Sequence, residues 1–136
     1  MNDTTRRRFL TTAGVAGVAL AAGRARAEAP GAGKTTLALV GCAHIHVPGF
    51  ARILSERPDV RVKWAWDPDP ARVAKWGGVV GATTAGSAAE ILADPEVKGL
   101  VVLSETNRHR ELVEAAVAAG KHLFVEKPLG ITGAEG

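Results

Sequence analysis

Polar segments in this sequence stand directly after short apolar runs, where their side chains could meet a ligand. Three such segments are Gly41–His46, Ser104–His109 and Glu126–Pro128. The carboxylate of Glu126 and the ammonium group of Lys127 could hold or transfer protons, and the imidazoles, hydroxyls and amides of the other segments could bind a polar ligand. Because the carboxyl ends of parallel strands meet at one edge of a sheet, we expect these segments to lie close together.

The first segment occupies the place where a dinucleotide-binding fold carries its glycine-rich loop. Such a loop reads Gly-x-Gly-x-x-Gly and opens the first helix. Here only Gly41 is present. Ala43 puts a methyl group where the backbone should approach a diphosphate, and His46 puts a bulky ring where we expect the helix to contact the strand. This loop alone therefore does not establish a dinucleotide site.

An acidic residue follows the second apolar run. Asp67 comes directly after Val60–Trp66 and 26 residues after Gly41, close to where an acidic side chain accepts hydrogen bonds from the adenosine ribose hydroxyls. A carboxylate at this position repels a 2′-phosphate, whereas Arg72 nearby would attract one. The spacing favours NAD over NADP. Without that spacing, Asp67-Pro68-Asp69-Pro70 would be interpreted as a turn and a helix cap.

The polar segments alternate with predicted strands and helices. The predicted strands are residues 37–40, 60–66, 100–103 and 122–125; the predicted helices are 48–56, 70–76, one that begins at the Ser87–Glu90 capping box, and 108–119. In the last helix, apolar residues recur at helical spacing at Leu112, Ala115, Ala116 and Ala119, and Gly120 is placed to end the helix. This alternation predicts an α/β fold, a doubly wound, Rossmann-like parallel sheet.

The segment around the last predicted strand is the most specific part of the sequence. Residues 119–128 read Ala-Gly-Lys-His-Leu-Phe-Val-Glu-Lys-Pro, which resembles the A-G-K-H-x-x-x-E-K-P signature of the Gfo/Idh/MocA family, relatives of glucose–fructose oxidoreductase and inositol dehydrogenase. Asp94-Pro95-Glu96-Val97 is also similar to that family. The resemblance covers residues 35–136. It implies an oxidoreductase that transfers hydride between NAD(P) and a sugar- or cyclitol-like alcohol, and the position of Asp67 makes NAD the preferred cofactor.

The resemblance also implies roles for individual residues. It makes Lys127 the catalytic residue, which would stabilise developing charge or join a proton relay. The residues that it implies for the diphosphate are Gly41, Cys42, Ala43, His44, Ile45 and His46. The other implied dinucleotide contacts are Asp67 at the adenosine ribose, Ser104, Glu105, Thr106 and Asn107 at the nicotinamide ribose, and His109, Glu126 and Pro128.

The family resemblance further implies a second, substrate-binding domain. We expect that domain to lie outside these 136 residues, and we expect the nucleotide-binding domain to be inactive without it. A small polyol or sugar would then be bound through the second domain. Relatives in the family are often homo-oligomers.

The N-terminal residues carry a pattern that is typical of export. Thr5–Leu10 matches the [ST]-R-R-x-F-L pattern of twin-arginine signals, a weakly apolar stretch follows from Thr12 to Ala22, and Ala25-Arg26-Ala27 offers a small-x-small cleavage site. We expect a signal peptide over residues 1–27, a linker over 28–34 and the dinucleotide-binding domain over 35–136. The expected partner is the twin-arginine export machinery, and the expected location is the periplasm or another extracytoplasmic compartment.

Charge and cysteine content argue against other classes of function. The chain carries 17 basic and 14 acidic residues, but five of the basic residues and one acidic residue precede the expected cleavage site. The remaining part is close to neutral, so we expect no binding to nucleic acid. Cys42 is the only cysteine, which excludes an intrachain disulfide and a cluster of thiolate ligands.

Two other interpretations stay open. His44 and His46 could form the H-x-H metal pair of an amidohydrolase. Such barrels need about 250 residues, and no third or fourth ligand is evident in the sequence, so we expect no metal. The substituted glycine loop also fits a non-catalytic periplasmic binding domain that kept the fold and lost turnover.

Overall fold

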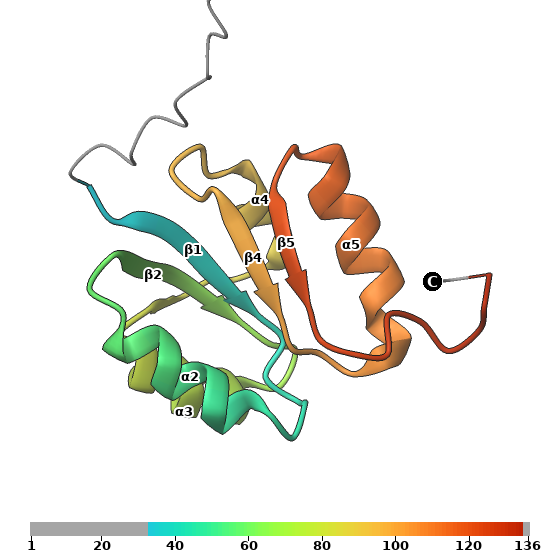
Figure 1. Ribbon diagram of the computed structural model, residues 1–136, viewed down its shortest axis with the longest axis horizontal. Coiled ribbons are helices and arrows are strands. Elements are labelled where there is room, and N and C mark those ends of the chain that lie inside the picture. Colours follow the sequence, from blue (N-terminus) through green and yellow to red (C-terminus); the bar gives the residue numbers. More distant parts are fainter. Residues whose placement is uncertain (1–32, 135–136) are drawn as a thin grey trace, which may run out of the picture. The chain divides into compact units, whose positions relative to one another are not determined.

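A parallel sheet of five strands runs through residues 33–134, the part of the chain that the computed structural model describes (Figure 1). The strands are β1 (Thr35–Val40), β2 (Val60–Trp66), β3 (Thr83–Thr84), β4 (Gly99–Val102) and β5 (His122–Val125). The helices are α2 (Val47–Glu56), α3 (Pro70–Val80), α4 (Ala88–Ala93), the 3₁₀ turn η1 (Thr106–Arg108) and α5 (His109–Ala118). The strand order is β3-β2-β1-β4-β5, and all pairs are parallel. The predicted Rossmann-like fold is therefore confirmed.

The predicted signal peptide over residues 1–27 lies outside the described residues, as does most of the predicted linker over 28–34. Gly33 and Lys34, the last two residues of that linker, are exposed and belong to no helix or strand. None of the helices within residues 33–134 is long and apolar enough to cross a membrane.

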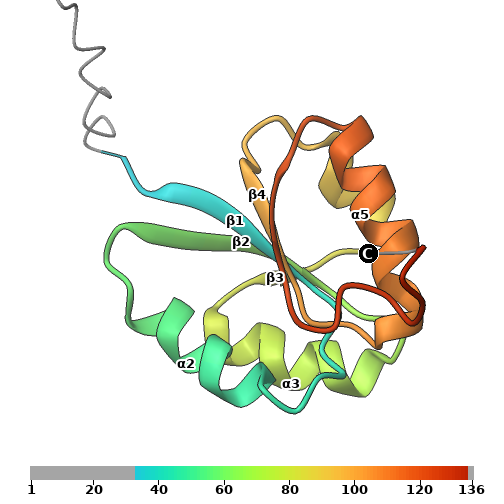
Figure 2. The ribbon, with the colours of Figure 1, turned by 45° about the vertical axis from the view of Figure 1, so that its right-hand side comes forward.

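Each face of the sheet buries its own apolar layer, because successive side chains of a strand point to opposite faces. On β1, Ala38 and Val40 pack toward Ile91 of α4 and Leu112 of α5. Leu39, between them, packs on the opposite face, where the buried cluster comprises Leu39, Cys42, Val47, Val62, Ala65, Val73, Val101 and Leu103. Helices α2 and α3 cover that second face (Figure 2). The central strands are buried on both faces, as their uninterrupted apolar runs predict.

Short polar contacts fix where the helices begin and end. The side chain of Asp69 accepts a hydrogen bond from the amide of Ala71 at the start of α3, and that helix ends at Gly81 in the left-handed conformation. Ser87 accepts from the amide of Glu90, so the predicted cap of α4 is confirmed. Gly120 adopts a φ of 66° just after α5, as expected.

The structure differs most from the sequence prediction at β3, α3 and α5. The two-residue strand β3 is too short to produce an alternating pattern, and it was missed. Helix α3 runs four residues past Trp76, because Gly77 allows the helix to lie close to Ala65 of β2. In α5, Ala115 and Ala119 are exposed, and the buried row is His109, Leu112 and Ala116 instead. The buried row of α5 keeps Leu112 and Ala116 from the predicted row but adds His109. The face of the helix that packs on the sheet is therefore rotated about the helix axis from the predicted face.

The last strand lies at the edge of the sheet and is only half covered. β5 pairs with β4 on one side, and Phe124 is 45% exposed. Its ring packs against Phe50 of α2 with centroids 4.9 Å apart. The predicted strand is confirmed, but it is not buried on both faces as the central strands are.

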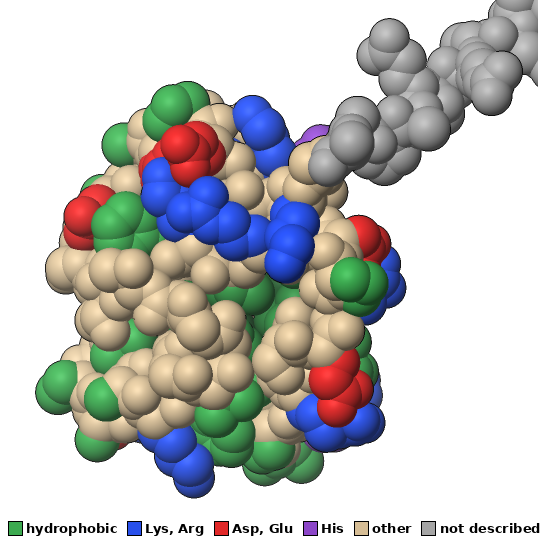
Figure 3. Space-filling model, turned by 90° about the vertical axis from the view of Figure 1, so that its left-hand side faces the viewer, with side chains coloured by type: hydrophobic (Ala, Val, Ile, Leu, Met, Phe, Trp, Pro, Cys, Tyr) green, Lys and Arg blue, Asp and Glu red, His purple; other side chains and the backbone are tan. Residues whose placement is uncertain are grey.

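Charges of both signs share the surface near the start of β2. Figure 3 shows lysine and arginine side chains gathered close to acidic ones on one face of the domain. Arg57 pairs with Asp59, and Lys63 pairs with Asp94 at 2.6 Å and with Glu96 at 2.9 Å. Hydrogen bonds from Lys63 hold the pKa of Asp94 well below its usual range. These basic side chains are therefore neutralised by neighbours in the fold.

The first connection depends on a glycine at the end of β1. Gly41 has a φ of 79°, and a Cβ atom at this position would lie 2.5 Å from the Cα and N atoms of Ser104, which follows β4. A real side chain does not tolerate either condition. Gly41 therefore allows the loop after β1 to cross close to the end of β4.

We predict that Gly41→Ala lowers the free energy of unfolding by roughly 1–3 kcal/mol or more, because backbone strain and steric overlap add. Gly49→Ala is the matched control: Gly49 lies in α2 with open space around it, so alanine there should leave stability unchanged or raise it by up to about 1 kcal/mol. Urea unfolding followed by circular dichroism measures both. Equal stability of the Gly41→Ala variant and the unchanged chain would contradict the close approach.

Candidate functional site

The sequence-predicted site residues gather at the carboxyl edge of the sheet. The loop after β1 supplies residues 41–46, and Asp67 follows β2. The segments after β4 and β5 supply residues 104–109 and 126–128. Since β1 and β4 are neighbours although they are not consecutive in sequence, the strand order reverses between them, and ligands of such folds bind at this switch point. The expected clustering of the polar segments is confirmed.

Asp67 anchors the loop after β1 through its side chain. Its carboxylate accepts the amide of Cys42 at 2.5 Å and the amide of Asp69 at 2.8 Å. The side chain is fully buried, so both bonds are shielded from water. Asp67 therefore fixes the backbone of the loop. With both oxygens bonded and no exposed side-chain surface, it is not placed to accept the ribose hydroxyls that the sequence analysis assigned to it.

Arg72 lies at the centre of a group of three carboxylates beside this loop. Its Nη1 atom lies 2.6 Å from Glu105 and 3.5 Å from Asp67, and its Nε atom lies 3.3 Å from Asp69. The hydrogen bond with Arg72 lowers the pKa of Glu105 and raises that of Arg72. Arg72 and the three carboxylates together carry a net negative charge beside the position predicted for the adenosine ribose.

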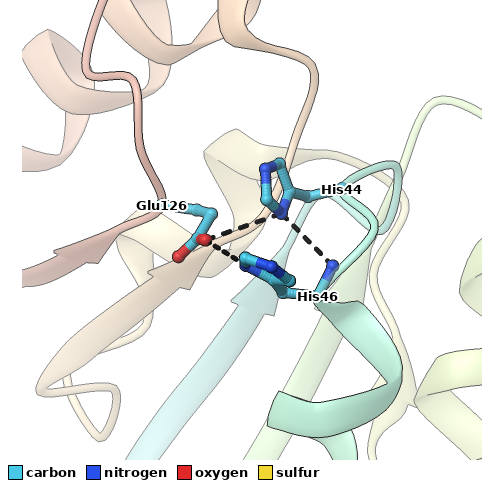
Figure 4. A group of neighbouring side chains, drawn as sticks. All are labelled: His44, His46 and Glu126. Carbon is cyan, nitrogen blue, oxygen red and sulfur yellow. Dashed lines mark hydrogen bonds and ion pairs between the residues drawn. The ribbon is translucent and has the colours of Figure 1, made fainter.

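A histidine pair and a glutamate meet across the site (Figure 4). The Nδ1 atom of His46 is hydrogen bonded to Oε1 of Glu126, and Nδ1 of His44 lies 3.7 Å from the same oxygen. The amide of His46 donates to Nδ1 of His44 at 3.3 Å. Hydrogen bonding by His46 is the main cause of the lowered pKa of Glu126, and the positive charge of Lys127 adds to it. The loop after β1 is thus joined to the end of β5.

This arrangement corrects two expectations about the histidines. We expected the ring of His46 at the contact between helix and strand, but its side chain is 46% exposed and turns toward Glu126 instead. No third metal ligand was evident in the sequence, but Glu126, 80 residues away, joins His44 and His46. The physical reason is the parallel pairing of β1, β4 and β5, which brings their carboxyl ends together.

His109 joins the Glu126–Pro128 segment to the end of β4. It is fully buried, with Nδ1 2.9 Å from the carbonyl oxygen of Pro128 and Nε2 3.2 Å from that of Ser104. Both ring nitrogens therefore face backbone carbonyls, and the imidazole links the ends of β4 and β5. Lys127 and Pro128 are exposed at this edge, joined by a cis peptide bond.

The remaining predicted site residues differ in accessibility. Ile45 is 82% exposed at the tip of the loop, and Asn107 is also exposed, whereas Ala43 and Thr106 are half-buried. Cys42 is buried, and burial followed by the charge of Asp67 raises the pKa of its thiol to about 12. Such a thiol stays protonated at neutral pH and is a poor nucleophile. Cys42 contributes packing and its backbone amide.

Three features of this edge fit a dinucleotide. Gly41 permits the tight turn that brings the loop across the switch point. Helix α2 begins at the loop, and its N-cap His46 makes no side-chain cap hydrogen bond. The Val47 amide donates to the carbonyl oxygen of His44, and Pro48 has no N–H. Gly49 is therefore the residue of the first turn whose amide could meet an anion. The Oε2 atom of Glu105 is buried and has no hydrogen-bond partner within the described residues, so this oxygen lacks the donor that a buried carboxylate oxygen normally has, and a ribose hydroxyl could supply one if the side chain turned toward it.

Comparisons with known proteins agree with this geometry. Residues 35–136 match the Gfo/Idh/MocA oxidoreductase family, which has an NAD-binding Rossmann fold. Inositol 2-dehydrogenase 3 of Saccharopolyspora erythraea is 37% identical over 84 residues, which cover 62% of this chain and 24% of that protein.

Solved structures share the fold as well. GenD2 from gentamicin A biosynthesis, in complex with NAD, superposes with a TM-score of 0.69 and 27% identity, over 76% of this chain and 29% of that one. An NAD-binding oxidoreductase from Klebsiella pneumoniae superposes with a TM-score of 0.61 and 25% identity, over 75% and 29% of the two chains. The matches span less than a third of the length of these relatives.

Proposed function

Because this chain belongs to the Gfo/Idh/MocA oxidoreductase family and forms its NAD(P)-binding Rossmann domain, we propose that it is the cofactor half of an enzyme that oxidises a sugar- or cyclitol-like alcohol or reduces the corresponding ketone. The observation that carries this proposal is the junction of residues 126–128 with the loop after β1. Lys127 directly follows Glu126, so this junction supports a position for Lys127 near the switch point, where a bound dinucleotide would present its nicotinamide. The similarity to inositol 2-dehydrogenase 3 supports a polyol substrate.

In this proposal, one group of residues binds the cofactor and another residue, Lys127, takes part in proton transfer. The loop after β1 and the amide of Gly49 in α2 would hold the diphosphate, with Asp67 holding the backbone of that loop in place. Glu105, whose Oε2 atom has no hydrogen-bond partner within the described residues, would accept a hydrogen bond from a ribose hydroxyl once its side chain turns toward the ligand. The nicotinamide supplies hydride transfer when it is bound. Lys127 holds a proton at Nζ, where it can hydrogen bond to the reacting oxygen of the substrate. His109 is a positioning residue, because its contacts hold the backbone at Pro128.

The charges around Arg72 support a preference for NAD. A 2′-phosphate would add negative charge beside Asp67, Asp69 and Glu105, and these carboxylates already surround the one guanidinium group. An unmodified ribose adds no charge there. It can also donate hydroxyl hydrogens to carboxylate oxygens.

We predict that the folded chain binds NAD more tightly than NADP by about tenfold or more. A 2′-phosphate next to these carboxylates would be repelled by them even at a protein surface, where the effective dielectric constant is high. Titration followed by tryptophan fluorescence measures both cofactors. Arg72→Ala should weaken NADP binding further, whereas Arg52→Ala, which removes an arginine paired with Glu56 on α2, should change neither. Tighter binding of NADP by the unchanged chain would contradict the proposed preference and show that Arg72 or the altered loop governs the choice of cofactor instead.

In the enzyme that contains this domain, we predict that Lys127→Ala and Lys127→Met reduce turnover on the order of a hundredfold, because each removes a charge that acts on the transition state. Affinity for the dinucleotide should stay nearly normal. Lys75→Met is the control, since Lys75 lies on α3 with its ammonium group over the ring of Trp76. Steady-state kinetics and cofactor titration separate the two effects. Near-normal turnover of either Lys127 variant would leave Lys127 a surface residue without a catalytic role.

We further propose that the protein is exported in folded form through the twin-arginine pathway, on the evidence of the sequence of residues 5–27. We predict that replacing Arg6 and Arg7 by lysine causes the uncleaved precursor to accumulate in the cytoplasm. Replacing Arg24 by lysine is the control, because this arginine lies outside the twin-arginine pattern. Fractionation followed by immunoblotting measures the distribution. Equal periplasmic amounts of the double variant and the unchanged protein would contradict the proposal.

A further inference from the structure

The substituted glycine loop brings together a set of side chains that a dinucleotide site does not require. His44 and His46 replace ordinary loop residues, and Glu126 meets both imidazoles at the end of β5 (Figure 4). The two rings stand edge to face with centroids 4.8 Å apart. One atom from each of the three side chains lies within 4.8 Å of the others. The proposed hydride transfer does not use the two imidazoles.

The separation of His44 and Glu126 is close to that of two ligands of one metal ion. Nitrogen and oxygen ligands lie about 2.0–2.2 Å from zinc, so two ligands of a tetrahedral ion are about 3.4 Å apart. His44 Nδ1 and Glu126 Oε1 are 3.7 Å apart. His46 and Glu126 are now in direct hydrogen-bond contact, and the half-exposed side chain of His46 can turn to admit an ion between them. The ion would take the place of the proton that His46 and Glu126 share, and Nδ1 of His44 would give up the hydrogen bond that it accepts from the amide of His46.

The chemistry of the donors limits the class of ion. Two imidazoles and a carboxylate suit zinc and neighbouring first-row transition metals, whereas magnesium and calcium prefer sites built from oxygen alone. Glu126 is buried, so its carboxylate interacts strongly with a cation. Three protein ligands also leave a fourth position for water or a ligand oxygen, the pattern of zinc sites that act on a ligand.

We propose that His44, His46 and Glu126 form a binding site for a divalent transition-metal ion of the zinc type at the carboxyl edge of the sheet. The loop after β1 supplies two ligands at a spacing of i and i+2, and β5 supplies the third. This site goes beyond the proposed oxidoreductase function and does not depend on dinucleotide binding. It is therefore tested without NAD or NADP.

The test measures zinc binding to the full chain, purified without a histidine tag. Isothermal titration calorimetry near neutral pH should give one equivalent of Zn²⁺ per chain and no binding of Mg²⁺. Because loss of an outer-shell partner alone changes metal affinity by about 10- to 100-fold, His44→Ala, His46→Ala and Glu126→Gln should each weaken zinc binding by at least about 100-fold. His122→Ala is the matched control, since His122 lies at the start of β5, away from the site.

A second measurement on the unchanged chain does not rely on the folding of any variant. Co²⁺ should bind in place of Zn²⁺ and give the visible absorption bands of a four-coordinate ion, and added Zn²⁺ should remove them. Zinc binding that is absent, that is unaffected by the three site variants, or that is lost equally in His122→Ala would overturn the proposal. Absorption bands of a fully hydrated, six-coordinate Co²⁺ would also overturn it. None of these outcomes bears on whether the domain binds a dinucleotide.

Discussion

The close approach of the first connection to the end of β4 is the constraint on which the site depends. Gly41 lies against the backbone of Ser104, and only a residue without a side chain fits there. The loop then continues along β4, where the amides of Ala43 and His44 donate to the carbonyl oxygen of Leu103. The following residues are thereby carried to β5, and every contact of His44 and His46 with Glu126 depends on that course.

Electrostatic contacts complete what the backbone begins. Asp67 is buried and accepts two backbone amides, so the second strand fixes the loop that follows the first. Arg72 links Asp67, Asp69 and Glu105, which follow two strands on either side of β1. His109 links the ends of β4 and β5 in a similar way. The family resemblance implies that Asp67, Glu105 and His109 contact the ligand. In the structure, these side chains hold the edge of the sheet in shape.

The two histidines alter the chemistry of a common binding edge. A glycine-rich loop presents backbone amides to a diphosphate, whereas most amides of this loop are already hydrogen bonded within the protein. This loop presents imidazoles instead, one of them hydrogen bonded to a buried carboxylate. The imidazoles can donate hydrogen bonds to an anion or, as neutral ligands, hold a metal ion. The same fold can in this way support a different set of contacts without any change in strand order.

The sequence by itself determined the fold class, the central strands, the helix caps and the grouping of polar segments at one edge, because these follow from local patterns of apolar, capping and turn residues. It also supplied the family, through residues 119–128. It did not reveal β3, the extent of α3 past Gly77 or the buried row of α5, since each depends on contacts with another element. Only the tertiary structure joined Glu126 to His44 and His46 and enclosed Asp67, because strand order and side-chain direction bring together residues that are far apart in the chain.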